Sequence, residues 1–356
     1  MYDFLIVGAG MFGATFAERA KSAGKRVLVI DQRDHIGGNC FTKEISNINV
    51  HWYGAHIFHT NDKSIWEYVN RFTKFNNFTN QVKAFYDGKF YQLPINLFTM
   101  NQLWGIKKPQ EAIDYLNNVK IHINDPKNME EWYLANFGQE IYEKFFKGYT
   151  TKQWRRPPSE LPVSIAKRIP LRLTHNNNYF TDTYQGIPIG GYTNMFERML
   201  DGVEVKLNTP LDNQWNNYAK HLVYSGRPDI LMNMKYGELQ YTTLNFEHFT
   251  AAGDYQGNAV INYTSEDVPY TRIIEHKHFE HDMTDKTIVT KEYPIDWTKN
   301  ATPYYVIPGC DGIYEKYKYD IKNKGIILGG RLGRHQYLDM HQVIANALYE
   351  AERALK

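Results

Sequence analysis

Three glycines near the amino terminus have the spacing of a phosphate-binding turn. Gly8, Gly10 and Gly13 follow an apolar run at residues 4–7 and precede a helical stretch at 14–23. In such a turn the first glycine permits a tight bend, the second lets the backbone approach a pyrophosphate, and the third lets helix and strand pack closely. The N–H groups at the start of the helix then face the phosphates. The spacing therefore predicts a dinucleotide-binding site.

An acidic residue lies at the position where a dinucleotide-binding site has the carboxylate that binds the ribose. Residues 25–31 are typical of a second strand, which ends at Asp31, and this carboxylate would accept hydrogen bonds from a ribose diol. Strand, glycine turn, helix, strand and acid follow in order, which favours the dinucleotide site over an ordinary turn with a surface aspartate. Gly37, Gly38 and Asn39 come shortly afterwards. This doublet is similar to the second fingerprint of FAD-binding folds and favours FAD over NAD.

Aromatic and basic residues gather in the middle of the chain. Ile141, Phe145 and Tyr149 recur every four residues, with Phe146 one step round, which predicts a helix. Their rings either pack in a core or form a platform for a flat base. A segment with prolines, arginines and no period follows at 161–179. We interpret it as a lid that closes on phosphate; the alternative is a solvated basic loop.

The remaining pattern predicts the elements that position these residues. Asp87-Gly88 between β-rich runs predicts a hairpin, and a helix is expected to begin near Met129. Strands that return to the first domain are expected at 202–207, 221–226 and 326–328. Strands of a second, antiparallel sheet are expected at 240–246, 259–263 and 286–290. A final helix is expected from His341 onward.

Composition narrows the class of protein. The 356 residues suggest two to three units at about 150 residues each. A net charge of +2 gives no charge-driven case for nucleic acid, and an aromatic content of 15% excludes a disordered chain. The two cysteines, Cys40 and Cys310, exclude a disulfide scaffold, and we predict no metal site. We expect no signal peptide, no membrane span and a cytoplasmic location.

Longer motifs point to one family. The chain resembles the bacterial UDP-galactopyranose mutases along essentially its whole length. The resemblance is carried by the glycine turn and by segments at 37–39, 56–60, 93–96, 145–154, 168–170, 178–180, 270–273, 303–305, 329–333 and 336–340. The most specific of these are the helix end that carries Trp154 and the segment Tyr337-Leu338-Asp339-Met340. Two features depart from the family pattern: the pair Arg334-His335, and Gln153 at a position that is more often hydrophobic.

The resemblance implies a reaction without net redox change. The family holds FAD non-covalently and interconverts the pyranose and furanose forms of UDP-galactose, for galactofuranose-containing cell-surface polysaccharide. The flavin must be reduced. Its N5 attacks the anomeric carbon, UDP leaves, the adduct opens as an iminium ion, and the ring re-closes through the other hydroxyl. The family also suggests a homodimer. No separate catalytic triad is required, because the nucleophile belongs to the cofactor.

The resemblance also implies roles for individual residues. Arg168 and Arg272 would clamp the pyrophosphate, and with His56 and His59 they form the predicted catalytic set. The predicted cofactor-binding residues are Gly8, Gly10, Met11, Phe12, Gly13, Asp31, Gly38, Asn39, His56, Arg331, Tyr337 and Asp339. The predicted substrate-binding residues are Asn80, Phe145, Phe146, Tyr149, Thr150, Trp154, Arg168, Tyr179, Asn262, Arg272, Tyr305 and Tyr337. Each histidine has a purely structural alternative.

The predicted fold class is α/β, with a Rossmann-like FAD-binding domain that carries two insertions. The domains are predicted to be a FAD-binding domain (1–78, 180–232 and 306–356), a helical insertion (95–160), an antiparallel sheet domain (79–94 and 233–305) and a mobile lid (161–179). Four alternatives stay open. They are a flavin amine oxidase or desaturase on the same fold, a non-catalytic nucleotide-sugar or flavin binder, an NAD dehydrogenase, and a mutase that prefers UDP-N-acetylgalactosamine.

Overall fold

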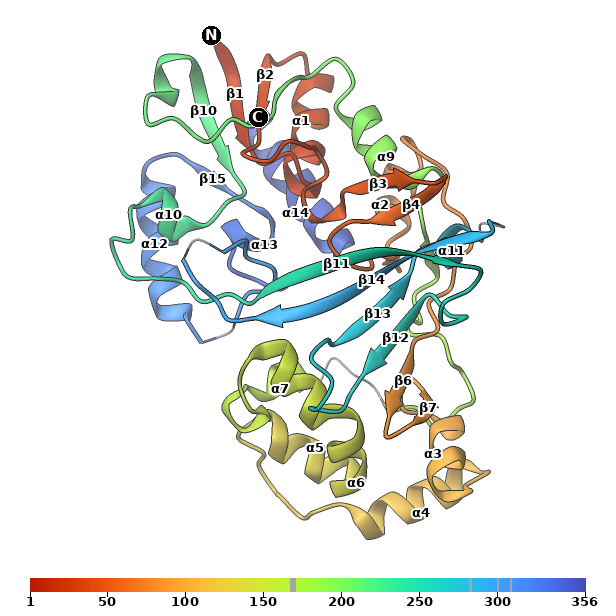
Figure 1. Cartoon of the computed structure of the whole chain (residues 1–356). Helices are drawn as coiled ribbons and strands as arrows, with labels where there is room; N and C mark the ends of the chain where they lie inside the picture. Colours follow the sequence, from red (N-terminus) through yellow and green to blue (C-terminus); the bar gives the residue numbers. More distant parts are fainter. Residues whose placement is uncertain (167–170, 282–283, 300, 308) are drawn as a thin grey trace. The chain divides into compact units, whose positions relative to one another are not determined.

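The chain folds into two units, shown in the computed structural model of Figure 1. The structure describes residues 1–166, 171–281, 284–299, 301–307 and 309–356. The first unit comprises Met1–Phe78, Asp182–Tyr241 and Lys299–Lys356, and the second comprises Thr79–Thr181 and Thr242–Thr298. No helix among the described residues is both long and apolar enough to cross a membrane.

A parallel sheet forms the centre of the first unit. Its strands run in the order β15 (Ile327–Leu328), β10 (Ala219–Tyr224), β1 (Tyr2–Val7), β2 (Val27–Ile30) and β9 (Glu204–Lys206). The predicted βαβ unit and the three returning strands are therefore confirmed. Two small antiparallel sheets pair β3 (Thr42–Ile45) with β4 (Ile48–His51) and β5 (Phe58–Thr60) with β8 (Tyr184–Gly186).

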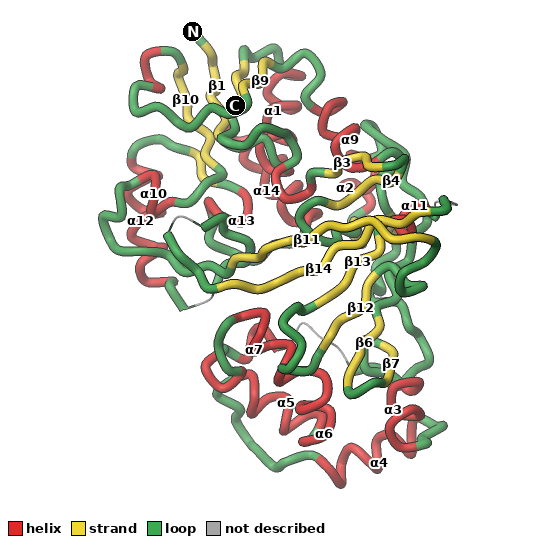
Figure 2. Tube along the Cα trace, in the orientation of Figure 1, coloured by secondary structure: helices red, strands yellow, loops and turns green. Residues whose placement is uncertain are grey.

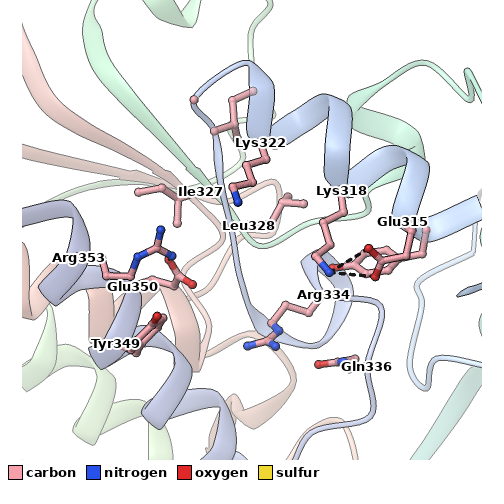
Figure 3. A pocket seen from close by; sticks show the side chains of 13 residues that line it. Glu315, Lys318, Lys322, Ile327, Leu328, Arg334, Gln336, Tyr349, Glu350 and Arg353 are labelled. Atoms are coloured by element: carbon pink, nitrogen blue, oxygen red, sulfur yellow. Dashed lines mark hydrogen bonds and ion pairs between the residues drawn. The ribbon is translucent and has the colours of Figure 1, made fainter.

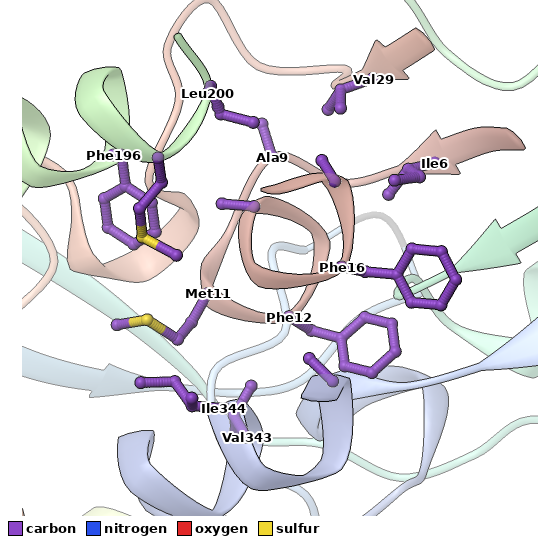
Figure 4. Packing of buried hydrophobic residues seen from close by; sticks show 14 of the residues in the cluster. Ile6, Ala9, Met11, Phe12, Phe16, Val29, Phe196, Leu200, Val343 and Ile344 are labelled. Atoms are coloured by element: carbon purple, nitrogen blue, oxygen red, sulfur yellow. The ribbon is translucent and has the colours of Figure 1, made fainter. Parts of the chain in front are cut away.

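Helices cover this sheet and bury its apolar strands. They are α1 (Met11–Ser22), α2 (Lys63–Val69), α9 (Gly191–Met199), α10 (Pro228–Leu231), α12 (Asp311–Asn323), α13 (Gly330–Gly333) and α14 (Met340–Leu355). Short 3₁₀ turns are η1 (Gly38–Cys40) and η4 (Trp215–Asn217). Helix α1 packs on α14 and α9, and Figure 4 shows Met11, Phe12 and Phe16 of α1 between side chains of the neighbouring helices and strands. Burial of this apolar surface is the main force that holds the unit together.

Replacing Phe16 by alanine should destabilise the first unit strongly. Its ring is fully buried and meets the edge of Phe4 at 5.4 Å between centroids. Removing a buried phenylalanine ring costs about 3–5 kcal/mol of unfolding free energy, because a cavity remains. Urea unfolding of the two proteins measures the loss. Phe98→Ala is the control: this ring is 42% exposed, and its removal should change stability by less than about 1 kcal/mol.

A six-stranded sheet organises the second unit (Figure 2). Its order is β11 (Thr243–Ala252), β14 (Lys286–Ile295), β13 (Arg272–Glu275), β12 (Val260–Tyr263), β6 (Lys83–Tyr86) and β7 (Lys89–Gln92). The predicted Asp87-Gly88 hairpin joins β6 to β7. The expectation of a wholly antiparallel sheet is wrong at one pair, since β12 and β6 are parallel. These strands are distant in sequence, so no tight turn forces them to be antiparallel.

Helices occupy most of residues 97–166 in the second unit. They are α3 (Leu97–Trp104), α4 (Pro109–Val119), α5 (Met129–Phe137), α6 (Gln139–Ile141), α7 (Gly148–Trp154), η3 (Pro158–Glu160) and α8 (Val163–Ala166), while α11 (Lys277–Glu280) lies between β13 and β14. Helix α5 begins at Met129 as predicted, where the Asn128 side chain accepts the N–H of Glu131 at 2.9 Å. Between α6 and α7 the chain adopts a π-helical segment, η2 (Tyr142–Lys147).

The observed boundary between the units differs from the predicted one. Two segments that the sequence places in the sheet domain belong to the first unit, namely 233–241 and 299–305. Both are tied to the buried ion pair of Arg227 and Asp229. The Asp229 carboxylate accepts the N–H of Leu239 at 3.1 Å, and Arg227 donates to the carbonyl oxygen of Lys299 at 3.0 Å. The ion pair itself joins residues two positions apart, but the backbone groups that it holds lie up to 72 residues away, so the sequence does not show which segments it ties to the first unit.

The predicted lid at 161–179 contains more structure than a loop. Helix α8 lies within it, and the N–H of Arg172 donates to the carbonyl oxygen of Ile95 at 2.9 Å. The Asn96 side chain donates to Asn177 Oδ1 at 2.7 Å. Residues 167–170, which include Arg168, lie outside the described residues. Closure of this segment stays a prediction.

Candidate active site

The glycine turn lies at the carboxyl end of β1. A Cβ atom on Gly13 would stand 1.9 Å from the carbonyl oxygen of Gly8, so only glycine lets α1 lie this close to the strand. Helix α1 begins at Gly10, which offers no side-chain cap, and its first turn carries no acid. Its N–H groups therefore keep the partial positive charge that attracts phosphate. Met11 and Phe12 point into the core, so they can serve a cofactor only through their backbone.

The acid and the second glycine segment lie beside this turn. Asp31 is 8% exposed, and its two carboxylate oxygens accept the N–H groups of Ala9 at 2.8 Å and Arg33 at 2.9 Å. Each oxygen retains a second lone pair that can accept a ribose hydroxyl. A Cβ on Gly38 would lie 3.1 Å from the Cα of Gly10, so the two glycine segments meet backbone to backbone. Asn39 Oδ1 accepts from the Arg33 guanidinium at 3.0 Å.

The carboxyl-terminal part of the first unit contains four predicted residues. The Arg331 side chain donates to the carbonyl oxygen of Leu338 and lies over the Tyr337 ring, 5.3 Å from its centroid. Tyr337 in turn stacks on Tyr305 at 5.2 Å. Asp339 begins α14, where its N–H donates to the side chain of Gln342. Arg331, Tyr337 and Tyr305 therefore form one cluster in the first unit, and Asp339 follows Tyr337 by two residues.

The two predicted histidines have defined surroundings in the first unit. His56 is buried and its Nδ1 lies 2.8 Å from the carbonyl oxygen of Gly54, which can only accept, so Nδ1 donates to it. His59 Nδ1 lies 2.9 Å from the Asp182 carboxylate, and its ring meets His341 edge-on at 5.4 Å. Burial lowers the pKa of His341, with His59 as a second cause. Sequence reasoning missed Asp182 and His341 as neighbours of His59.

A cross-strand row carries the charged residues of the second unit. Asn262 on β12 is directly opposite Arg272 on β13, which is directly opposite Glu292 on β14. Directly opposite residues point to the same face of a sheet. Arg272 Nε lies 3.2 Å from the Glu292 carboxylate, and the Arg272 guanidinium also donates to the Tyr149 hydroxyl at 2.6 Å. The sheet and α7 together therefore hold the guanidinium in place.

The two phenylalanines of η2 pack in the core of the second unit. Both are 3% exposed. Phe146 stacks on Tyr133 at 3.9 Å between centroids, whereas Phe145 meets Tyr91 of β7 edge-on at 5.3 Å. The observed packing matches the core interpretation of these rings, and Tyr149 remains partly exposed. A four-residue period cannot reveal a π-helical turn, which sends adjacent rings toward different partners.

The other predicted substrate residues of the second unit lie in three places. Asn80 is buried, its carbonyl oxygen accepts the N–H of Tyr179 at 2.7 Å, and its Oδ1 has no hydrogen-bond partner among the described residues. Thr150 and Trp154 are buried on α7. Asn262 Oδ1 likewise has no partner among the described residues. Two shielded amide oxygens without protein donors are groups that a polar ligand can satisfy.

Comparisons with known proteins decide the family. A family model described as UDP-galactopyranose mutase matches residues 144–337, and one described as an NAD(P)-binding Rossmann-like domain matches residues 6–72. A probable UDP-galactopyranose mutase of Klebsiella pneumoniae is 43% identical over 99% of this chain and 94% of its own length. The chain belongs to the UDP-galactopyranose mutase family. Mutases of this family are isomerases, so the chain is an enzyme of that class.

Two further comparisons concern the fold and the breadth of the family. A crystal structure of a reduced UDP-galactopyranose mutase has a TM-score of 0.82 at 14% identity and covers 100% of this chain and 94% of its own. It shows the same fold and confirms the predicted fold class. A dTDP-fucopyranose mutase of Escherichia coli is 38% identical over 100% of this chain and 99% of its own length. Mutases named for different sugar nucleotides therefore have similar sequence identities to this chain.

The structure shows two buried charged residues near the predicted site residues that the sequence analysis did not single out. Glu292 holds Arg272 from the adjacent strand and is 2% exposed. Lys152 is buried on α7, where its ammonium meets three carbonyl oxygens. In the sequence, Lys152 is recognisable only as a charged residue within the aromatic-rich stretch 145–154. Glu292 is recognisable only as a charged residue within a strand of alternating pattern. A buried charge needs a compensating partner, so these two residues become informative only when the structure shows which groups they contact.

A hollow of about 450 Å³ lies in the first unit, and none of its lining residues is a predicted site residue (Figure 3). Its lining comes from α12, β15, the segment after α13, and α14. Arg334, which departs from the family pattern, is one of its lining residues. Its neighbour His335 is buried instead and packs on Tyr241 and Tyr314. His335 therefore takes the place of an aromatic ring, which is the physical reason that the departure is tolerated.

Proposed function

We propose that this enzyme interconverts UDP-galactopyranose and UDP-galactofuranose with reduced FAD and without net redox change. The observation that carries the proposal is the row of Asn262, Arg272 and Glu292, with Tyr149 on the same guanidinium. A fixed arginine beside a polar amide and a tyrosine suits a nucleoside diphosphate. Membership of the mutase family supports the sugar isomerisation.

The residues of the first unit fit a flavin dinucleotide. The backbone cradle of Gly10 and Gly38, the uncapped start of α1 and the Asp31 carboxylate would hold the pyrophosphate and the ribose. Arg331, Tyr337 and Asp339 would contact the remainder of the cofactor. Reduced FAD, when bound, supplies a nucleophile, its N5, for the anomeric carbon of the sugar. No nucleophilic side chain is then required.

Arg272 would stabilise the departing diphosphate. Negative charge grows on UDP as its bond to the anomeric carbon breaks, so a fixed cation stabilises the transition state more than the bound substrate. Glu292 and Tyr149 hold the guanidinium without a change of position during the reaction. Arg168 is proposed as the second cation on the basis of sequence alone. Asn262 would hold uridine, with Tyr179 beside it, and Phe145 and Phe146, whose rings pack on Tyr91 and Tyr133, would support this wall from the core side.

The remaining predicted residues would face the sugar. Asn80, Thr150, Trp154 and Tyr305 are proposed to bind it, and His56 is proposed to act near the flavin and the sugar. The carbonyl oxygen of Gly54 fixes the orientation of the His56 ring, and His56 is proposed as one candidate for the proton transfers of ring opening. His59 is held by Asp182 and is proposed as a neighbour of the same region.

The deciding experiment uses the redox state of the enzyme. Dithionite-reduced protein is incubated with UDP-galactofuranose, and the products are separated by chromatography. We expect UDP-galactopyranose to accumulate with reduced protein and not with oxidised protein. Equal conversion in both states, or none with reduced protein, would contradict the proposal. A flavin amine oxidase would instead need an electron acceptor.

The preferred sugar nucleotide is tested in the same assay. The 38% identity with a dTDP-fucopyranose mutase favours dTDP-fucose as the second candidate substrate. Parallel reactions with UDP-galactofuranose, dTDP-fucofuranose and the UDP-N-acetylgalactosamine analogue compare their kcat/KM values. We expect the UDP-galactose pair to give the highest value. The cytoplasmic location, the homodimer and the role in cell-surface polysaccharide stay predictions.

A further inference from the structure

Lys152 forms an unusual contact inside the second unit. It lies on α7 and is 7% exposed. Its ammonium donates to the carbonyl oxygens of Tyr263 at 2.8 Å, Val268 at 2.9 Å and Tyr270 at 3.0 Å. An ammonium has three N–H donors, so all three are used. The lysine therefore closes the segment 263–270 into a fixed loop between β12 and β13.

Two neighbouring contacts press the same loop against the helix. Thr264 Oγ1 donates to the carbonyl oxygen of Lys144 at 2.6 Å. A Cβ on Gly148 would stand 2.5 Å from the carbonyl oxygen of Thr264, so the helix backbone touches the loop backbone. The turn at the start of α7 and the loop are therefore in direct contact, and Lys152 joins them one turn farther along the helix.

The loop joins two residues of the proposed diphosphate site. Asn262 immediately precedes the loop, and Arg272 follows it by two residues. On the other side, Tyr149 of α7 accepts from Arg272 at 2.6 Å, and it lies three residues before Lys152. A displacement of α7 from the loop would therefore change the position of the tyrosine and of the guanidinium at once.

We propose that Lys152 is a positioning residue for the nucleoside diphosphate. It sets the separation of α7 from the β12–β13 loop and so aligns Tyr149, Asn262 and Arg272 as one binding surface. It does this through three backbone carbonyl groups and touches no substrate itself. The inference rests on the proposed function, because that function places the diphosphate at Arg272.

The charge of Lys152 links this arrangement to pH. Burial lowers the pKa of Lys152 to about 8, while Asp267 and Glu266 act in the opposite direction. Below this pH the ammonium has three donors for three carbonyl groups. Above it the neutral amine has two donors and a lone pair, so one carbonyl oxygen loses its partner. Nucleotide binding should therefore weaken as the pH rises above about 8.

The test compares Lys152→Met with Lys152→Arg in the whole protein loaded with FAD, with UDP as the probe. UDP affinity is measured by calorimetry, and kinetic constants are measured in the mutase assay. We expect Lys152→Met to weaken UDP binding by about tenfold or more, since small misplacements of a binding group are costly. Flavin content should stay unchanged. Lys147→Met, which removes an exposed lysine five residues away, should bind UDP as the wild type does.

Two readouts separate positioning from general stability. Hydrogen exchange of residues 263–270 should speed up in Lys152→Met and not in the control. The decline of UDP affinity above pH 8 should occur in the wild type and be absent in Lys152→Arg, whose guanidinium stays charged. A pH-independent wild type overturns the inference even where Lys152→Met fails to fold.

Two outcomes distinguish this inference from the proposed function. Wild-type UDP affinity in Lys152→Met, with unchanged exchange in the loop, would overturn the role of Lys152 alone. A wild-type protein that does not bind UDP would overturn both the proposed function and the inference.

Discussion

Replacing Arg272 by alanine is expected to lower kcat by about 10²- to 10³-fold, the usual cost of removing one donor from a developing anion. The guanidinium lies between Glu292 and Tyr149 and needs no rearrangement as UDP departs. The loss should appear in kcat more than in KM, because the charge that Arg272 stabilises is largest in the transition state. Steady-state kinetics of the dithionite-reduced protein measure both constants. FAD should stay bound, since its predicted residues lie in the first unit.

The same substitution also leaves Glu292 buried without its cation. An uncompensated buried carboxylate destabilises a protein, so lost activity could follow from lost stability. The double variant Arg272→Ala/Glu292→Gln removes this charge and should recover stability without recovering kcat. Arg272→Lys keeps the charge but not the planar fork, so its activity should be intermediate. Arg155→Ala, at an exposed ion pair in the same unit, should behave as the wild type. A near-normal kcat in Arg272→Ala would place the diphosphate elsewhere.

Replacing Gly13 by alanine is expected to abolish stable FAD binding. The added Cβ would stand 1.9 Å from the carbonyl oxygen of Gly8 and 3.2 Å from the Ile6 side chain. Helix α1 would then have to move away from β1, and its first N–H groups would leave the phosphate position. The purified variant should lack flavin absorbance after gel filtration. We expect its affinity for FAD to fall by about 100-fold or more, because helix and turn shift together.

A matched glycine in the same unit provides the control. Gly312 lies in helix α12, and a Cβ at this position would meet no atom within 4 Å. Gly312→Ala should retain FAD and gain up to about 1 kcal/mol of stability, since alanine favours a helix over glycine. Equal FAD binding by Gly13→Ala and Gly312→Ala would contradict a cofactor site at this turn. Loss of FAD from both variants would point to a general effect of glycine replacement.

The sequence predicted the local elements of the fold well. The glycine turn and Asp31 fall within one stretch of 31 residues, and the close approach of Gly13 to the carbonyl oxygen of Gly8 lies inside it. The hairpin at Asp87-Gly88 and the start of α5 at Met129 were predicted for the same reason. Turns and helix caps depend on residues a few positions apart, so their chemistry is visible in the sequence itself.

The sequence was less informative where distant segments meet. The segment at residue 299 is tied to the first unit by a hydrogen bond from Arg227, 72 residues away, and the parallel pairing of β6 with β12 joins strands far apart in the chain. The packing of Phe145 and Phe146 depends on a π-helical turn that no periodicity indicates. In each case a tertiary contact decides which structure the segment adopts, because such contacts can outweigh the local conformational preference of its residues.

The sequence by itself determined which chemistry this protein can carry. The glycine turn and its acid predict a dinucleotide, because their spacing suits a pyrophosphate and a ribose, whereas Arg168 and Arg272 are assigned to the diphosphate only through the resemblance to the family. Only the tertiary structure decided how that chemistry is positioned. Arg272 gains its partners Glu292 and Tyr149 from β14 and α7, and Lys152 closes a loop more than 100 residues away. The physical reason is that sheet register and helix packing are set by burial of the whole unit, while residue type is local.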